Sequence, residues 1–195
     1  MTLSGDRRRS DAVAERCSLR RARPEDIQAL NALITRSARE LSVGFYTAEQ
    51  AEAAIRHVFG VDSALVDDGT YFVAEVDGLI AGCGGWSHRR TLYGGDQRKV
   101  GENLHLDPEI DAARIRAFFV SPDWARRGIG RCILEACATA AGAAGFATLE
   151  LMATLPGVPM YAACGFTEVE RVVDRLPDGT DLPFVRMRRS VRAPR

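Results

Sequence analysis

The chain has 195 residues, of which 46% are apolar and 27% are charged, and its formal net charge is +0. These values are those of a folded globular protein, and no apolar run reaches the ~20 residues that cross a membrane, which argues against a disordered or transmembrane chain. Because the charges balance, the protein has no overall positive field to attract nucleic acid. We therefore expect one compact domain without a nucleic-acid or membrane partner.

The cysteines and the N-terminal residues indicate a reducing, cytoplasmic location. The five cysteines are odd in number and contain no C-x-x-C pair, so a disulfide framework and a structural zinc site are both poorly supported. The three histidines lack ligand spacing, so we expect no metal. Residues 1–17 are rich in arginine but lack the apolar stretch of a secretory signal. We expect them to be a flexible leader before a single domain at 18–192.

The start of the domain predicts one strand followed by two helices. Residues 19–23 can pair as a short strand, and Pro24 then opens a helix whose apolar residues recur at helical spacing. Thr47 and Gln50 stand at the two positions of a capping box, which starts the second helix.

A β-hairpin is the clearest local prediction. Two β-prone runs, 71–76 and 79–83, flank the turn dipeptide Asp77-Gly78. The glycine cluster at 82–85 indicates a place where another backbone or a ligand comes close. The next connection, 87–113, is polar and weakly patterned, and so long a connection inside a compact domain is usually functional or mobile. We expect it to line a substrate site.

The second half of the chain alternates strands and helices. Its longest helix is entered through Gly128 and Gly130 and capped by Gly145. The expected elements are a strand at 114–120, this helix to about residue 144, a strand at 148–152, a short helix at 156–163 and a closing strand pair at 168–175 and 183–189. A strand, a helix and a strand with glycines at the helix entrance form a βα unit in a mixed sheet.

The turn that enters this helix has the chemistry of a phosphate site. Its glycines let backbone N–H groups face an anion at the positive end of the helix, and three arginines surround it. It is not a P-loop, because no Lys-Ser/Thr follows the required spacing, and Ile133 occupies the third glycine position of the dinucleotide fingerprint. On these residues alone, a tight turn without a ligand explains the glycines equally well.

A longer sequence pattern favours a phosphate site over a turn without a ligand. The run V-x-P-x-x-x-R-R-G-I-G-x-x-x-L at 120–134, followed by M-Y-x-x-x-G-F at 160–166, resembles the GNAT superfamily of coenzyme A-dependent N-acyltransferases. The resemblance extends over roughly residues 18 to 190 in the order of elements. Two positions depart from the family's pattern, since Ala125 stands where Gln or Arg is common and Thr154 where Asn is common.

The resemblance implies an α/β fold with a mixed, centrally splayed sheet flanked by helices, and acetyl-CoA as the co-substrate. The pyrophosphate would bind the turn, and the pantetheine arm would pair with an exposed strand backbone where 114–120 and 148–153 splay apart. The implied cofactor-binding residues are Phe118, Phe119, Val120, Arg126, Arg127, Gly128, Ile129, Gly130, Arg131 and Thr154.

The resemblance also implies that Tyr161 protonates the departing thiolate. A tyrosine with a pKa of ~10 stays protonated at neutral pH, although a core tyrosine is the plainer interpretation. The acceptor amine must attack uncharged, and His88 and Glu150 are the candidate bases. An exposed histidine and an ion-paired strand residue are the plainer interpretations of these two.

The acceptor side carries weaker signals. Phe45, Tyr46, Trp86 and Tyr93 are candidates to wall an acceptor pocket, and core or rim packing explains each equally well. We interpret Cys164 as a packing residue rather than a nucleophile. The sequence therefore predicts acetyl transfer to a primary amine of a small molecule or peptide by direct attack in a ternary complex. A catalytically weak coenzyme A-binding sensor or interaction domain is the alternative, and a homodimer is left open.

Overall fold

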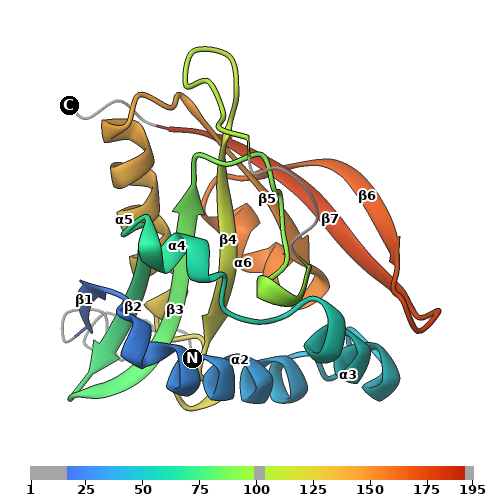
Figure 1. Cartoon of the computed structure of the whole chain (residues 1–195). Coiled ribbons are helices and arrows are strands. Elements are labelled where there is room, and N and C mark those ends of the chain that lie inside the picture. Colours follow the sequence, from blue (N-terminus) through green and yellow to red (C-terminus); the bar gives the residue numbers. More distant parts are fainter. Residues whose placement is uncertain (1–16, 99–103, 192–195) are drawn as a thin grey trace, which may run out of the picture.

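The computed structural model describes residues 17–98 and 104–191, which form a seven-stranded sheet with helices on both faces (Figure 1). The order of the strands is β1-β2-β3-β4-β5-β7-β6, and every neighbouring pair is antiparallel except β4 with β5. The predicted mixed sheet is therefore confirmed. The strands are β1 (Cys17–Arg21), β2 (Tyr71–Val76), β3 (Leu79–Ser87), β4 (Ala113–Val120), β5 (Thr148–Thr154), β6 (Thr167–Arg175) and β7 (Asp181–Ser190).

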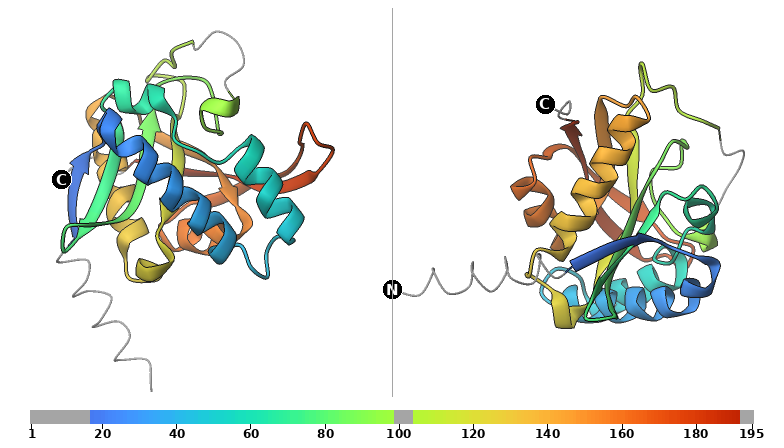
Figure 2. Two further views of the ribbon diagram at one scale, coloured as in Figure 1. Left: turned by 60° about the horizontal axis from the view of Figure 1, so that its bottom comes forward. Right: turned by 90° about the vertical axis from the view of Figure 1, so that its left-hand side faces the viewer.

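The helices lie in two groups on opposite faces of the sheet (Figure 2). Helices α5 and α6 pack on one face, and α2, α3 and α4 cover the other. The helices are α2 (Ile27–Leu41), α3 (Ala48–His57), α4 (Ser63–Asp67), α5 (Ile129–Ala143) and α6 (Val158–Ala163), with 3-10 turns η1 (Pro24–Asp26), η2 (Asp96–Arg98), η3 (Pro122–Trp124) and η4 (Leu155–Gly157). Among the described residues, no helix is long and apolar enough to cross a bilayer.

The first elements follow their local signals with two differences. In the predicted capping box, the Gln50 amide donates to Thr47 Oγ1 at 3.1 Å and the Thr47 amide donates to Gln50 Oε1 at 3.0 Å. Strand β1 begins at Cys17, which therefore belongs to the sheet and not to the leader, whereas residues 1–16 lie outside the described part of the chain. Helix α4, capped by Asp62, was not predicted because a single turn shows no helical periodicity.

Strand β3 runs through the glycine cluster, beyond its predicted end. A Cβ atom at Gly84 would lie 2.3 Å from the Phe118 ring, and one at Gly82 would lie 3.0 Å from the Phe119 carbonyl oxygen. The glycines therefore admit β4 at close range, so the close approach expected here is made by the neighbouring strand.

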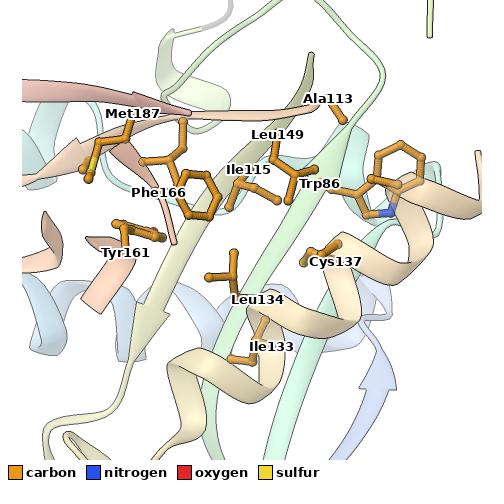
Figure 3. Packing of buried hydrophobic residues seen from close by; sticks show 14 of the residues in the cluster. Trp86, Ala113, Ile115, Ile133, Leu134, Cys137, Leu149, Tyr161, Phe166 and Met187 are labelled. Atoms are coloured by element: carbon orange, nitrogen blue, oxygen red, sulfur yellow. The ribbon is translucent and has the colours of Figure 1, made fainter. Parts of the chain in front are cut away.

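Helix α5 forms one side of the largest core cluster. It lays Ile133, Leu134 and Cys137 against the strand residues Ile115 and Leu149 (Figure 3). Burial of this apolar surface fixes the start of α5 beside β4, which places the glycine turn at one end of the sheet.

The sheet splays between β4 and β5, as predicted. The two strands pair only from Ala113 to Ile115, opposite Leu149 to Leu151. Beyond this point Ala117 has a φ of +49° and the register of β4 with β3 shifts. The Tyr71 hydroxyl donates a hydrogen bond of 2.6 Å to the Ala117 carbonyl oxygen, which satisfies this irregular residue.

Strands β6 and β7 form a hairpin that extends the sheet beyond β5 (Figure 1). The hairpin turn is fastened to α3, because Arg56 Nη1 lies 2.9 Å from Asp178 Oδ2 and Gln50 Nε2 donates to the Asp181 carbonyl oxygen at 2.8 Å. These contacts bring α3 and the hairpin together on the face opposite α5.

Candidate active site

A cleft opens where β4 and β5 separate. It holds about 510 Å³ of empty space, its open mouth included. Its walls come from β4, β5, β7 and α6, from the link between α3 and α4, and from the 87–113 connection. The lining residues are Val58, Phe59, Gly60, Tyr93, Gly94, Gly95, Ile115, Arg116, Ala117, Phe118, Phe119, Met152, Thr154, Tyr161 and Phe184.

Residues from both faces of the sheet line the cleft. Phe118 lies on the α5 side, where its ring centroid is 5.9 Å from that of Tyr161. Phe119 lies on the other side, where its ring centroid is 5.4 Å from that of Phe59. Because neighbouring residues of a strand face opposite sides, β4 contributes to both halves of the cleft.

Tyr161 lies in α6 beside Phe166 (Figure 3), and its ring centroid is 5.7 Å from that of Phe166 and 5.9 Å from that of Phe118. The residue lines the cleft while being only 7% exposed, and its hydroxyl makes no hydrogen bond within the described part of the chain. Burial raises the pKa of Tyr161 well above its ordinary value, so the hydroxyl keeps its proton at neutral pH. The cleft lining therefore includes a tyrosine whose protonated hydroxyl is not bound to another group of the described residues.

The predicted phosphate turn lies between η3 and α5. Arg126 has a φ of +60° and Gly128 a φ of +84°, a conformation that glycine adopts without steric cost. Within the described residues, the amides of residues 127–131 donate no hydrogen bond, and the first helical bond runs from the Cys132 amide to the Gly128 carbonyl oxygen at 3.0 Å. Such unpaired N–H groups at the start of a helix form an anion site.

The arginines of the turn are exposed. The Arg127 guanidinium stacks over the Trp124 ring at 5.2 Å, and Arg131 Nη2 donates to the Ala163 carbonyl oxygen at 3.5 Å. Positive charge therefore surrounds the unpaired amides, on the same side of the sheet as Tyr161.

Thr154 ends β5 and lines the cleft beside Tyr161. A Cβ atom at Gly157 would lie 3.3 Å from Thr154 Oγ1 and 3.1 Å from Tyr161 Cε2. The hydroxyl of Thr154 therefore stands close to the ring of the proposed proton donor.

Glu150 lies outside the cleft, between two arginines. It is opposite Arg114 on β4 and opposite Arg188 on β7. Glu150 is 2% exposed, its Oε1 is 2.8 Å from Arg114 Nη1, and its Oε2 accepts from Arg188 Nε. Both carboxylate oxygens are held by cations, which matches the interpretation as an ion-paired strand residue.

His88 also lies outside the cleft, just beyond the end of β3. Its Nε2 is 3.9 Å from Asp68 Oδ2, and its ring centroid is 4.7 Å from that of His105. Burial lowers the pKa of His88 below its ordinary value, and the charge of Asp68 opposes this effect. The structure therefore brings neither candidate base to Tyr161. In residues 17–98 and 104–191, no three ligand-type side chains gather to hold a metal ion.

Two of the four aromatic candidates belong to the acceptor side of the cleft. Tyr93 lines it directly, with its ring centroid 5.3 Å from that of Phe184. Tyr46 lies behind this wall, where its hydroxyl donates to the Pro183 carbonyl oxygen at 2.6 Å and accepts from the Leu155 amide at 3.0 Å. Burial raises the pKa of Tyr46 to about 12. Tyr46 therefore fixes the wall without facing a substrate.

The remaining candidates lie elsewhere. Phe45 is 48% exposed in the turn between α2 and α3, and does not line the cleft. Trp86 is buried under α5, with its ring centroid 6.0 Å from that of Phe146, so it packs in the core and does not wall a pocket (Figure 3). Cys164 contacts Met160 Sδ at 3.9 Å and packs against the core, as expected.

Arg116 is a cleft residue that the sequence analysis missed. It is 3% exposed, its Nη1 is 2.5 Å from Asp62 Oδ2, and its Nη2 donates to the Gly94 carbonyl oxygen at 2.6 Å. Arg116 thus ties β4 to α4 and to the 87–113 connection. An arginine inside the apolar run of β4 is the sequence signal that could have identified it.

Comparison with known proteins gives one family match. The family model described as acetyltransferase (GNAT) domain matches residues 67–168 of the chain. This range includes β2 to β5, the phosphate turn and Tyr161. No curated protein matches the sequence significantly.

Several solved structures share the fold. One is a GCN5-related N-acetyltransferase from Rhodopseudomonas palustris, which is also described as a class-II aminotransferase. It is 24% identical to this chain with a TM-score of 0.65, and the match covers 89% of this chain and 94% of that one. PaiA N-acetyltransferase from Thermoplasma acidophilum, in complex with coenzyme A, is 15% identical with a TM-score of 0.58, over 89% and 98% of the two chains. The ribosomal-protein-S18-alanine N-acetyltransferase from Escherichia coli is 17% identical with a TM-score of 0.54, over 92% and 96%. At these identities the likeness establishes the fold.

Proposed function

Because the chain belongs to the acetyltransferase (GNAT) family, we propose that it transfers an acetyl group from acetyl-CoA to a primary amine, which attacks directly in a ternary complex. The observation that carries this proposal is the cleft through the splayed sheet, which has an anion site beside one face and Tyr161 within it. The complex of a similar structure with coenzyme A supports the choice of co-substrate. The five free cysteines support a cytoplasmic location.

The chain's own residues fit the coenzyme A thioester. The unpaired amides of residues 127–131 and the exposed arginines of the turn would hold the diphosphate. The edge of β4 from Phe118 to Val120 is not paired with β5, and would hydrogen-bond with the pantetheine arm as an added strand does. Thr154 would contact the same arm. In this arrangement the thioester would lie beside Tyr161.

Tyr161 would supply the proton that the departing thiolate needs. Tyr161 lines the cleft, its hydroxyl has no hydrogen-bond partner among the described residues, and it stays protonated because burial raises its pKa. No cysteine in the cleft lining provides a nucleophile, which supports direct attack by the amine without a covalent enzyme intermediate.

The test is an acetyl-CoA consumption screen over a panel of primary amines, with Tyr161→Phe as the matched variant. The variant keeps the ring beside Phe118 and Phe166 and removes only the hydroxyl. We expect kcat to fall by about 10² or more, at the lower end of general-acid contributions, with acetyl-CoA affinity nearly unchanged. Full activity of the variant across neutral pH would make Tyr161 structural. A wild type that binds coenzyme A but turns over no amine would support a sensor in place of an enzyme.

A further inference from the structure

Apolar and aromatic side chains line the half of the cleft opposite α5. We call this set the acceptor wall, and it consists of Val58, Phe59, Tyr93, Met152 and Phe184. These residues come from four separate places in the chain: the segment after α3, the 87–113 connection, β5 and β7. The ring of Tyr93 packs on that of Phe184, with centroids 5.3 Å apart. Aromatic surface of this kind favours apolar and planar substituents.

The charged groups around the acceptor wall are paired with one another. Arg116 is the one charged residue among the described residues of the cleft lining, and its ion pair with Asp62 makes this part of the wall neutral overall. Beside Tyr93, Arg98 Nη1 lies 2.5 Å from Asp174 Oδ2. Because each of these charges has its partner, the described residues of the wall present neither an unpaired carboxylate for an ammonium group nor an unpaired cation for a carboxylate.

The connection that carries Tyr93 is fastened across the cleft. The Gly95 amide donates to the Val58 carbonyl oxygen at 2.8 Å, and the Asp96 amide donates to the Val61 carbonyl oxygen at 3.1 Å. Together with the Arg98–Asp174 pair, these bonds join the connection to α3, α4 and β6. These bonds fix the segment that carries Tyr93 beside the cleft.

We propose that the acceptor is a small primary amine with an apolar or aromatic substituent and no carboxylate, and that the acceptor wall takes it up in its neutral form. This inference rests on the proposed function and names the substrate class of the same site. An apolar wall disfavours the ammonium form, since burial of an unpaired charge is costly. The enzyme then needs no side-chain base, which agrees with the positions of Glu150 and His88 outside the cleft.

The dependence of kcat/KM on pH should show whether the amine binds in its neutral form. The ionisable groups around the site are Arg116 on β4, Asp62 before α4, Tyr93 and Arg98 on the connection, Asp174 on β6, Tyr161 on α6, and Glu150 with its partners Arg114 and Arg188. Burial raises the pKa of both tyrosines, so both hydroxyls keep their protons at neutral pH. Each of the three carboxylates lies within 2.8 Å of an arginine nitrogen. The kcat/KM should therefore rise with the neutral fraction of the amine, without an inflection from the enzyme.

The experiment compares kcat/KM for benzylamine, its para-carboxylate, spermidine and an alanine-terminated peptide, each measured over a pH range. We expect benzylamine to exceed the three charged or larger acceptors by about tenfold or more. Phe184→Leu should lower kcat/KM for benzylamine by about two- to tenfold, because it removes a ring from the wall, while coenzyme A affinity stays the same.

Two results would overturn the inference and leave the proposed function intact. One is a preference for the carboxylate, spermidine or the peptide. The other is a pH profile for benzylamine with an inflection that belongs to the enzyme. Absence of turnover with every amine, in protein that still binds coenzyme A, would instead remove the proposed function and the inference with it.

Discussion

The turn proposed to bind phosphate and the acceptor wall proposed to bind the amine are built in opposite ways. The turn is a contiguous segment, 126–131, and its unpaired backbone N–H groups are the atoms that would bind. The wall is assembled from the segment after α3, the 87–113 connection, β5 and β7, and its side chains would determine its chemistry. A contiguous backbone site suits a co-substrate that is always the same, whereas a wall of separate side chains can be altered residue by residue to suit another acceptor.

The largest expected effect concerns the turn. Gly130→Asp adds a negative charge where the diphosphate would bind, so we expect coenzyme A affinity to fall by about 100-fold. A Cβ atom at Gly130 would be 3.6 Å from Met160 Cε and from Phe118 Cε1, which is ordinary contact, so the variant should fold. Gly130→Ala is the matched control and should bind normally. Calorimetry that shows equal affinity for wild type and Gly130→Asp would remove the turn from the cofactor site.

A smaller effect should follow from loosening the splay that joins the two regions. Tyr71→Phe removes the 2.6 Å hydrogen bond to the Ala117 carbonyl oxygen and leaves that buried group unpaired. We expect a loss of about 1–3 kcal/mol in the free energy of unfolding, measured with urea. Acetyl-CoA affinity and amine KM should both worsen, because Ala117 adjoins both halves of the cleft. An unchanged stability would show that the bond does not hold the irregular strand.

The smallest effect concerns the ion pair that holds the start of the 87–113 connection. Arg89 makes two hydrogen bonds to Asp68, at 2.7 and 2.8 Å, and this partner is the main cause that lowers the pKa of Asp68. A carboxyl with a lowered folded-state pKa adds stability above its unfolded pKa and loses it as the pH falls through the folded value. We expect Asp68→Asn to cost about 1 kcal/mol at neutral pH, with the difference from wild type shrinking below pH ~4. A difference that persists in acid would contradict this origin.

The elements around the phosphate turn could be predicted because their signals are local. The hairpin turn, the Thr47 capping box and the glycines that enter α5 each act through neighbouring residues. The short helix that holds Tyr161 was predicted in the same way.

The acceptor side could not be predicted in the same way, because tertiary packing decides it. Tyr93 and Trp86 are both aromatic residues near the 87–113 connection, yet one lines the cleft and the other lies in the core under α5. Glu150 was a candidate base with an ion-paired strand residue as its plainer interpretation, and the strand register places Arg114 and Arg188 beside it. Those neighbours are distant in sequence, so spacing alone does not reveal them.

The central claim is that coenzyme A binding and acceptor selection depend on different parts of the molecule. Calorimetry of coenzyme A binding to Asp174→Asn tests it most directly, because this isosteric change breaks the Arg98–Asp174 pair that holds the connection over the cleft. We predict a coenzyme A Kd equal to that of wild type, together with a several-fold change in amine KM. A large loss of coenzyme A affinity in the folded variant would contradict the division.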